Sequence, residues 1–115
     1  MAFSIENIQR SVKETKERYE ESHKSGRDPV TWMYELNHVK DMMNQHTDTK
    51  NWPQTLYSCF GVELIFSGLL ENCRMDTMAN IKKHAVNRMV NLGYRYKQAG
   101  FLWDAYKMCL EESEL

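Results

Sequence analysis

Hydrophobic residues recur at intervals of three and four along most of the chain, and this spacing predicts a fold built almost entirely of α-helices. Short polar or glycine-containing breaks divide the pattern into five segments. The expected helices cover about residues 5–24, 29–45, 53–73, 77–98 and 101–113. We therefore expect an all-α fold, a compact bundle of about five helices that forms a single helical domain over residues 1–115.

The third segment, 53–73, carries hydrophobic residues around its whole circumference. A helix that is apolar all round is normally buried, so we expect this helix to form the centre of the bundle. Gly61 and Gly68 lie on one side of it, and each costs about 1 kcal/mol of helix propensity. Close approach of a neighbouring helix is the expected compensation.

Local signals mark where the helices begin and end. Ser4 is placed to cap the first helix, and the segment Ser25–Pro29 separates the first helix from the second. Asp76 is placed to cap the fourth helix, and Ala99–Gly100 is the expected break before the fifth.

The last two helices carry small and large residues at a fixed spacing. These residues are Met89, Leu92, Gly93, Tyr96, Gly100, Ala105 and Cys109. Over residues 86–113 the spacing resembles one tetratricopeptide-repeat hairpin, a family that usually binds other proteins. The resemblance implies that the two helices touch at Gly93 and Ala105, with Tyr96 packed between them. A shift by the family's period of about 34 residues finds no second unit, so we expect one hairpin within a bundle.

Composition and charge narrow the function classes. The chain has 115 residues and a formal net charge of −1, which is not the balance of a protein that coats nucleic acid. We expect neither a secretory signal nor a membrane-spanning helix, because the chain has no sufficiently long apolar run. Cys59, Cys73 and Cys109 are far apart and odd in number, which indicates reduced thiols in a cytoplasmic protein.

Two Glu-x-x-His pairs, Glu20 with His23 and Glu35 with His38, are the most enzyme-like signal. In helical bundles such pairs hold two metal ions, so a metal-dependent helical enzyme is one alternative. Helical geometry turns Glu20 and His38 away from the apolar stripes, whereas metal ligands must project inward. We therefore expect solvated charges at these positions and no metal site.

Glu63, Ser67 and Glu71 form a thin polar edge on the hydrophobic third segment. A buried carboxylate needs a partner or a raised pKa, so we expect Glu63 to be exposed or to form a salt bridge rather than act as a catalytic acid. The sequence contains no glycine-rich phosphate loop, zinc-binding cysteine spacing or nucleophile–base motif. We expect a non-enzymatic protein with no catalytic residues and no cofactor.

The fourth segment carries a run of cations. Between Ile81 and Gly100 there is no acidic residue, and the basic residues are Lys82, Lys83, Arg88, Arg95 and Lys97. Such a surface suits contacts with phosphates, so a nucleic-acid-binding helical protein is the second alternative. The cations flank the apolar stripe on two sides, and they could instead complement the acidic residues of the first helix.

The interpretation that we favour is a small adaptor or regulator that binds a protein partner through helical surface. The expected anchors are aromatic residues that one bundle does not fully bury, together with arginines. They are Arg88, Tyr94, Arg95, Phe101, Trp103 and Tyr106. In size and composition the chain resembles virus- or phage-encoded modulators of host machinery. A homodimer is an alternative way to bury the same aromatics, and the sequence does not identify the partner.

Overall fold

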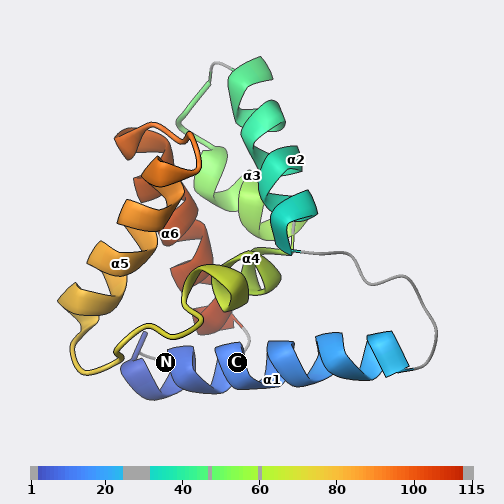
Figure 1. Ribbon diagram of the computed structural model, residues 1–115. Helices are drawn as coiled ribbons and strands as arrows, with labels where there is room; N and C mark the ends of the chain where they lie inside the picture. Colours follow the sequence, from blue (N-terminus) through green and yellow to red (C-terminus); the bar gives the residue numbers. More distant parts are fainter. Residues whose placement is uncertain (1–2, 25–31, 47, 60, 113–115) are drawn as a thin grey trace.

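The computed structural model describes residues 3–24, 32–46, 48–59 and 61–112, and these residues are helical with no strand among them. Six helices follow one another: α1 (Ile5–Lys24), α2 (Trp32–Gln45), α3 (Trp52–Cys59), α4 (Val62–Leu69), α5 (Met78–Asn91) and α6 (Tyr96–Glu112). Figure 1 shows α1 crossing one end of the molecule, with α5 and α6 on one side and α2 on the other. The all-α class is therefore confirmed.

Helix α1 has the predicted bounds. The backbone N–H of Asn7 donates a hydrogen bond to Ser4 Oγ at 3.3 Å, which is the expected N-terminal cap. Ile8, Ser11 and Thr15 are its buried residues, and the helix packs against α4 through this narrow stripe. The predicted break at Ser25–Pro29 and the predicted start of the second helix lie outside the described residues.

The single helix predicted over residues 53–73 is wrong, because two shorter helices, α3 and α4, occupy this segment. Gly61 stands at the N-cap of α4, and it is exposed, with no neighbouring helix close to it. The two helices bury different stripes. Helix α3 packs mainly on α6, whereas α4 contacts α1, α2, α5 and α6. Every residue of α4 is buried or half-buried, whereas α3 also has exposed residues, so the apolar circumference of the predicted helix belongs mainly to α4.

The close approach predicted at Gly68 is confirmed. A side chain at this position would overlap the indole ring of Trp32, which lies directly on the glycine. Because Gly68 belongs to α4 and Trp32 begins α2, the missing side chain lets the two helices pack closely.

The predicted break at Ala99–Gly100 is also wrong, since both residues lie inside α6. The chain turns instead at Gly93, whose φ of 103° is a left-handed conformation that favours glycine. The Gly93 N–H donates to Val90 O at 3.0 Å, and the Tyr94 N–H donates to Met89 O at 3.1 Å. This pair of bonds is the Schellman motif, which closes helix α5 two turns earlier than the sequence suggested.

The start of α5 differs slightly from the prediction. Thr77, not Asp76, is the N-cap, and its hydroxyl accepts a hydrogen bond from the Asn80 N–H at 3.1 Å. Asp76 accepts from the Asn80 side chain at 3.0 Å and pairs with Arg74 at 2.8 Å. No helix in the described part of the chain is long and apolar enough to cross a membrane.

Candidate functional site

Two of the predicted anchors, Trp103 and Tyr106, belong to the core. Trp103 is 3% exposed and Tyr106 is completely buried. Phe66 of α4 stacks on the Tyr106 ring at 4.2 Å between centroids, and it meets Trp103 edge-on at 5.7 Å. The expectation that one bundle leaves these residues partly exposed is therefore wrong, because α4 supplies an aromatic partner for both.

The burial of Tyr94 and Tyr96 is the opposite of what the sequence predicted. The sequence placed Tyr94 on the outer surface and Tyr96 inside, but Tyr94 is 4% exposed and Tyr96 is 77% exposed. The Tyr94 hydroxyl donates a hydrogen bond to Leu36 O of α2. Both positions were derived from one continuous helix over 77–98. The turn at Gly93 resets the helical phase and so reverses the direction of both rings.

The remaining anchors stay at or near the surface. Arg95 is exposed, whereas Arg88 and Phe101 are half-buried. Phe101 packs edge-on against the Trp52 ring at 5.3 Å, so its contact is mainly internal. Of the predicted aromatic anchors, none is largely exposed.

The outer side of α5 and the start of α6 carry a different set of exposed residues, which we call the basic face. It comprises Lys83, Asn87, Val90 and Asn91 of α5, together with Arg95, Tyr96 and Lys97 around the turn. Val90 is 41% exposed, and with Tyr96 it is one of four exposed large hydrophobic residues in the described chain. Lys40 of α2 reaches over Gly93 at the edge of this face. The four-residue turn between α5 and α6 brings the α5 part of the basic face close to its α6 part.

Charge is strongly segregated at the basic face. Residues 77–103 contain five cations and no acidic residue, whereas the rest of the chain carries ten cations and sixteen acidic residues. The five cations are Lys82, Lys83, Arg88, Arg95 and Lys97, and none forms an ion pair with another described residue. Helices α1 and α5 are not among the principal packing pairs, so the first helix does not cover this charge.

Elsewhere in the described chain, Lys16, Arg18 and Arg74 form ion pairs. Lys16 meets Glu71 at 3.3 Å, and Arg18 meets Glu63 at 3.3 Å. The predicted salt bridge of Glu63 is thus confirmed, with its side chain 27% exposed. Lys13, Lys40 and Lys50 likewise form no ion pair with a described residue, so residues 77–103 differ from the rest of the chain in lacking acidic residues.

Glu63 also accepts a hydrogen bond from the Cys109 thiol at 3.0 Å. Burial raises the pKa of Cys109 to about 12, and the hydrogen bond to Glu63 and the Glu63 charge add to the effect, while Arg18 opposes it. A thiol with so high a pKa is protonated at neutral pH and a poor nucleophile. Cys109 therefore acts in this contact as a hydrogen-bond donor to Glu63. Cys73 is likewise a free, half-buried thiol, and the Cys59 side chain lies outside the described residues.

The alternative metal site does not assemble in the described chain. Glu20 and His38 are exposed and Glu35 is half-buried, whereas the side chain of His23 lies outside the described residues. No group of three or more potential metal ligands occurs among the residues that the structure describes.

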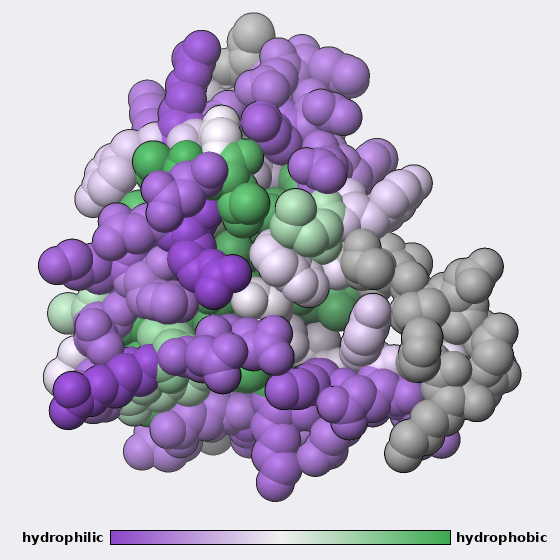
Figure 2. Space-filling model, in the orientation of Figure 1, coloured by the Kyte–Doolittle hydropathy of each residue, from purple (hydrophilic) through white to green (hydrophobic). Residues whose placement is uncertain are grey.

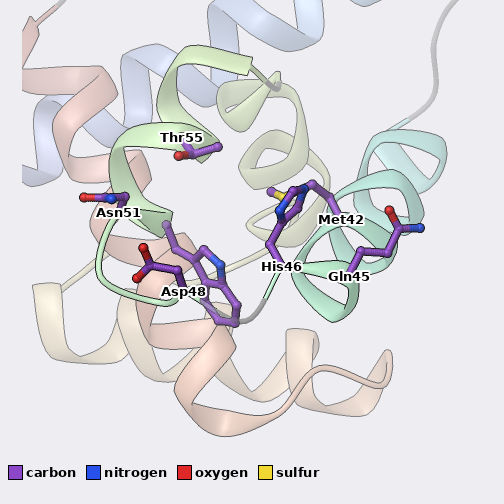
Figure 3. Close-up of a pocket in the computed structure, with 7 residues that line it drawn as sticks. Met42, Gln45, His46, Asp48, Asn51 and Thr55 are labelled. Atoms are coloured by element: carbon purple, nitrogen blue, oxygen red, sulfur yellow. The ribbon is translucent and has the colours of Figure 1, made fainter.

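A cavity of about 430 Å³, lined by both polar and apolar side chains, lies between the end of α2 and the start of α3. Figure 3 shows His46 and Met42 on one side of it, with Asp48 and Asn51 on the other. The Asp48 carboxylate accepts a hydrogen bond from the Lys50 N–H at 3.1 Å, so it is engaged in the loop itself. No nucleophile is paired with a base here, and the arrangement suggests no reaction.

The visible surface is mainly hydrophilic, with hydrophobic atoms showing in small areas between the hydrophilic ones (Figure 2). A broad apolar patch, which would indicate an obligate interface, is absent from this side of the described chain. No protein family model, curated protein or solved structure matches the chain significantly. The basic face is therefore the feature of the molecule that bears on its function.

Proposed function

We propose that the chain is a small non-enzymatic adaptor or regulator whose basic face docks on an acidic surface of a protein partner. The observation that carries this proposal is the group of unpaired cations in an acid-free segment, with Tyr96 and Val90 exposed among them. Charge complementarity speeds association and excludes partners of the same charge. Exposed tyrosine and arginine are residues that frequently anchor protein interfaces.

The distribution of apolar residues favours a protein as the partner. Val90 projects from the same side of α5 as Lys83, seven residues away, and an exposed aliphatic side chain has no evident role in binding phosphates. A protein surface offers both apolar groups and carboxylates. We therefore expect Val90 and Tyr96 at the centre of the contact, with Lys83 and Lys97 around them.

Affinity capture from the native host tests the proposal with a matched pair of variants. The face variant carries Lys83→Glu and Lys97→Glu, and the control variant carries Lys13→Glu and Lys50→Glu. All four lysines are exposed, and both variants change the net charge equally. The wild type and the control should capture the same protein, with or without nuclease, and the face variant should lose it. Equal capture by all three would contradict the proposal.

Nucleic-acid binding is the second candidate, and the exposed Tyr96 beside Arg95 and Lys97 favours it. An exposed aromatic ring next to cations can stack on an unpaired base while the cations meet the phosphates. Binding of a labelled single strand should then weaken steeply between about 50 and 200 mM salt, because counterions are released. Loss of that binding in the Tyr96→Ala variant, and of the captured partner after nuclease treatment, would favour this candidate over the first.

A further inference from the structure

A groove with a cavity of about 420 Å³ opens between α1 and α2 above α4. Both α1 and α2 pack on α4, and Figure 1 shows them approaching it from different sides. The volume lies within the range of small-molecule sites, about 300–1,000 Å³. None of the residues of the basic face lines this groove, so the inference is independent of the proposed function.

Regular helical spacing brings the lining side chains together. Lys16, Tyr19 and Glu20 lie three and four residues apart, so they share one ridge of α1. On α4, Gly68 leaves room for the Trp32 indole, which packs on the glycine and remains only half-buried. The groove therefore has aromatic side chains from two helices, Tyr19 and Trp32, along its apolar part.

Among the described residues, the charge of the groove is unbalanced. Lys16 pairs with Glu71 at 3.3 Å, so these two charges largely cancel each other. Glu20 lines the same groove, is exposed, and forms no hydrogen bond or ion pair with another described residue. One carboxylate is thus left over beside two aromatic rings, whose faces also attract cations.

We propose that this groove binds a small organic ammonium ion with an apolar body. The apolar body lies against Trp32 and the aliphatic side chain of Leu64 on α4, and the ammonium group lies near Glu20 and the aromatic faces. Both the carboxylate and the ring quadrupoles favour positive charge, whereas a carboxylate ligand would meet Glu20 as a like charge.

Three probes with matched bodies test the charge preference: 2-phenylethylamine, 2-phenylethanol and phenylacetate at pH 7. Binding is followed by NMR through the indole N–H resonances, with Trp32 assigned from the Trp32→Phe variant. Trp52 and Trp103 are buried and serve as internal references. The amine should shift the Trp32 resonance and bind about fivefold to tenfold more tightly than the alcohol, which is the effect of one partly screened ion pair. Phenylacetate should bind most weakly.

The Glu20→Gln variant should reduce the affinity for the amine to that for the alcohol and leave the affinity for the alcohol unchanged. Glu21→Gln is the matched control, because Glu21 is exposed on the same helix and does not line the groove. It should retain the preference for the amine. The proposal is overturned if no probe shifts the Trp32 resonance, if phenylacetate binds as tightly as the amine, or if both variants behave alike.

Discussion

Two buried tyrosine hydroxyls have different surroundings, although both rings belong to the core. The Tyr94 hydroxyl donates to Leu36 O and joins the turn after α5 to α2. The Tyr106 hydroxyl lies beside the Ser11 hydroxyl of α1 but outside hydrogen-bonding geometry, and Ser11 and Tyr106 have no hydrogen-bond partner for these hydroxyls among the described residues. Burial raises the pKa of both tyrosines. Their hydroxyls should therefore contribute differently to stability.

We expect Tyr94→Phe to lower the free energy of unfolding by about 1 kcal/mol, because a buried hydrogen bond is lost. Tyr106→Phe should leave it within about 0.5 kcal/mol or raise it, since the removed hydroxyl is buried without a partner. Urea unfolding of both variants beside the wild type measures the two differences. An equal loss in both variants would show that the Tyr106 hydroxyl is satisfied in solution.

Cys109 should react slowly with alkylating agents, because burial and Glu63 raise its pKa to about 12. At a pKa of about 12, about a thousandfold less thiolate is present at pH 8 than for a thiol with the ordinary pKa. Glu63→Gln removes the neighbouring charge and should increase the alkylation rate of Cys109 several-fold in peptide-resolved mass spectrometry. Cys73 in the same molecule is the internal control. An unchanged Cys109 rate would mean that burial alone protects the thiol.

At the scale of the elements, hydrophobic periodicity predicts helices well and their interruptions poorly. It located α1 completely, because one stripe runs from cap to end without a change of direction. It missed the breaks at Gly61 and Gly93, because hydrophobic residues continue through both turns. The dipeptide Leu92-Gly93 matched a repeat motif, yet Gly93 serves as the left-handed residue of a helix end. The position at which a helix ends depends on local hydrogen bonding, which hydrophobic periodicity does not encode.

Substitution of the glycines in the α5–α6 hairpin tests directly whether Gly93 is the left-handed residue that ends α5. Gly93→Ala should destabilise the protein by about 1–2 kcal/mol, because its φ of 103° disfavours a side chain and the new methyl group would meet Lys40. Gly100→Ala should stabilise it by about 0.5–1 kcal/mol, since Gly100 lies inside α6 with open space around it. Thermal melts of the two variants measure these opposite shifts. Stabilisation by Gly93→Ala would rule out the Schellman turn.

At the scale of the whole molecule, the sequence predicted the basic residues of the candidate site but not its aromatic residue. An acid-free run of 27 residues is visible without any structure, and all five of its cations remain unpaired in the described chain. The aromatic anchors were wrong because their exposure depends on which helix covers them. Trp103 and Tyr106 are covered by Phe66, a residue more than 35 positions away in sequence.

The uneven distribution of charge should also determine how strongly the folded protein binds to charged surfaces. Its net charge of −1 predicts weak retention on a cation-exchange resin at pH 7, but the basic face presents several cations together. We expect the folded protein to bind such a resin at low salt and to elute as screening shortens the range of the field, about 10 Å at 0.1 M. The face variant, Lys83→Glu with Lys97→Glu, should flow through. The control variant, Lys13→Glu with Lys50→Glu, has the same net charge and should elute later than the face variant. Identical elution of the two variants would show that net charge, and not its placement on α5 and α6, determines the interaction.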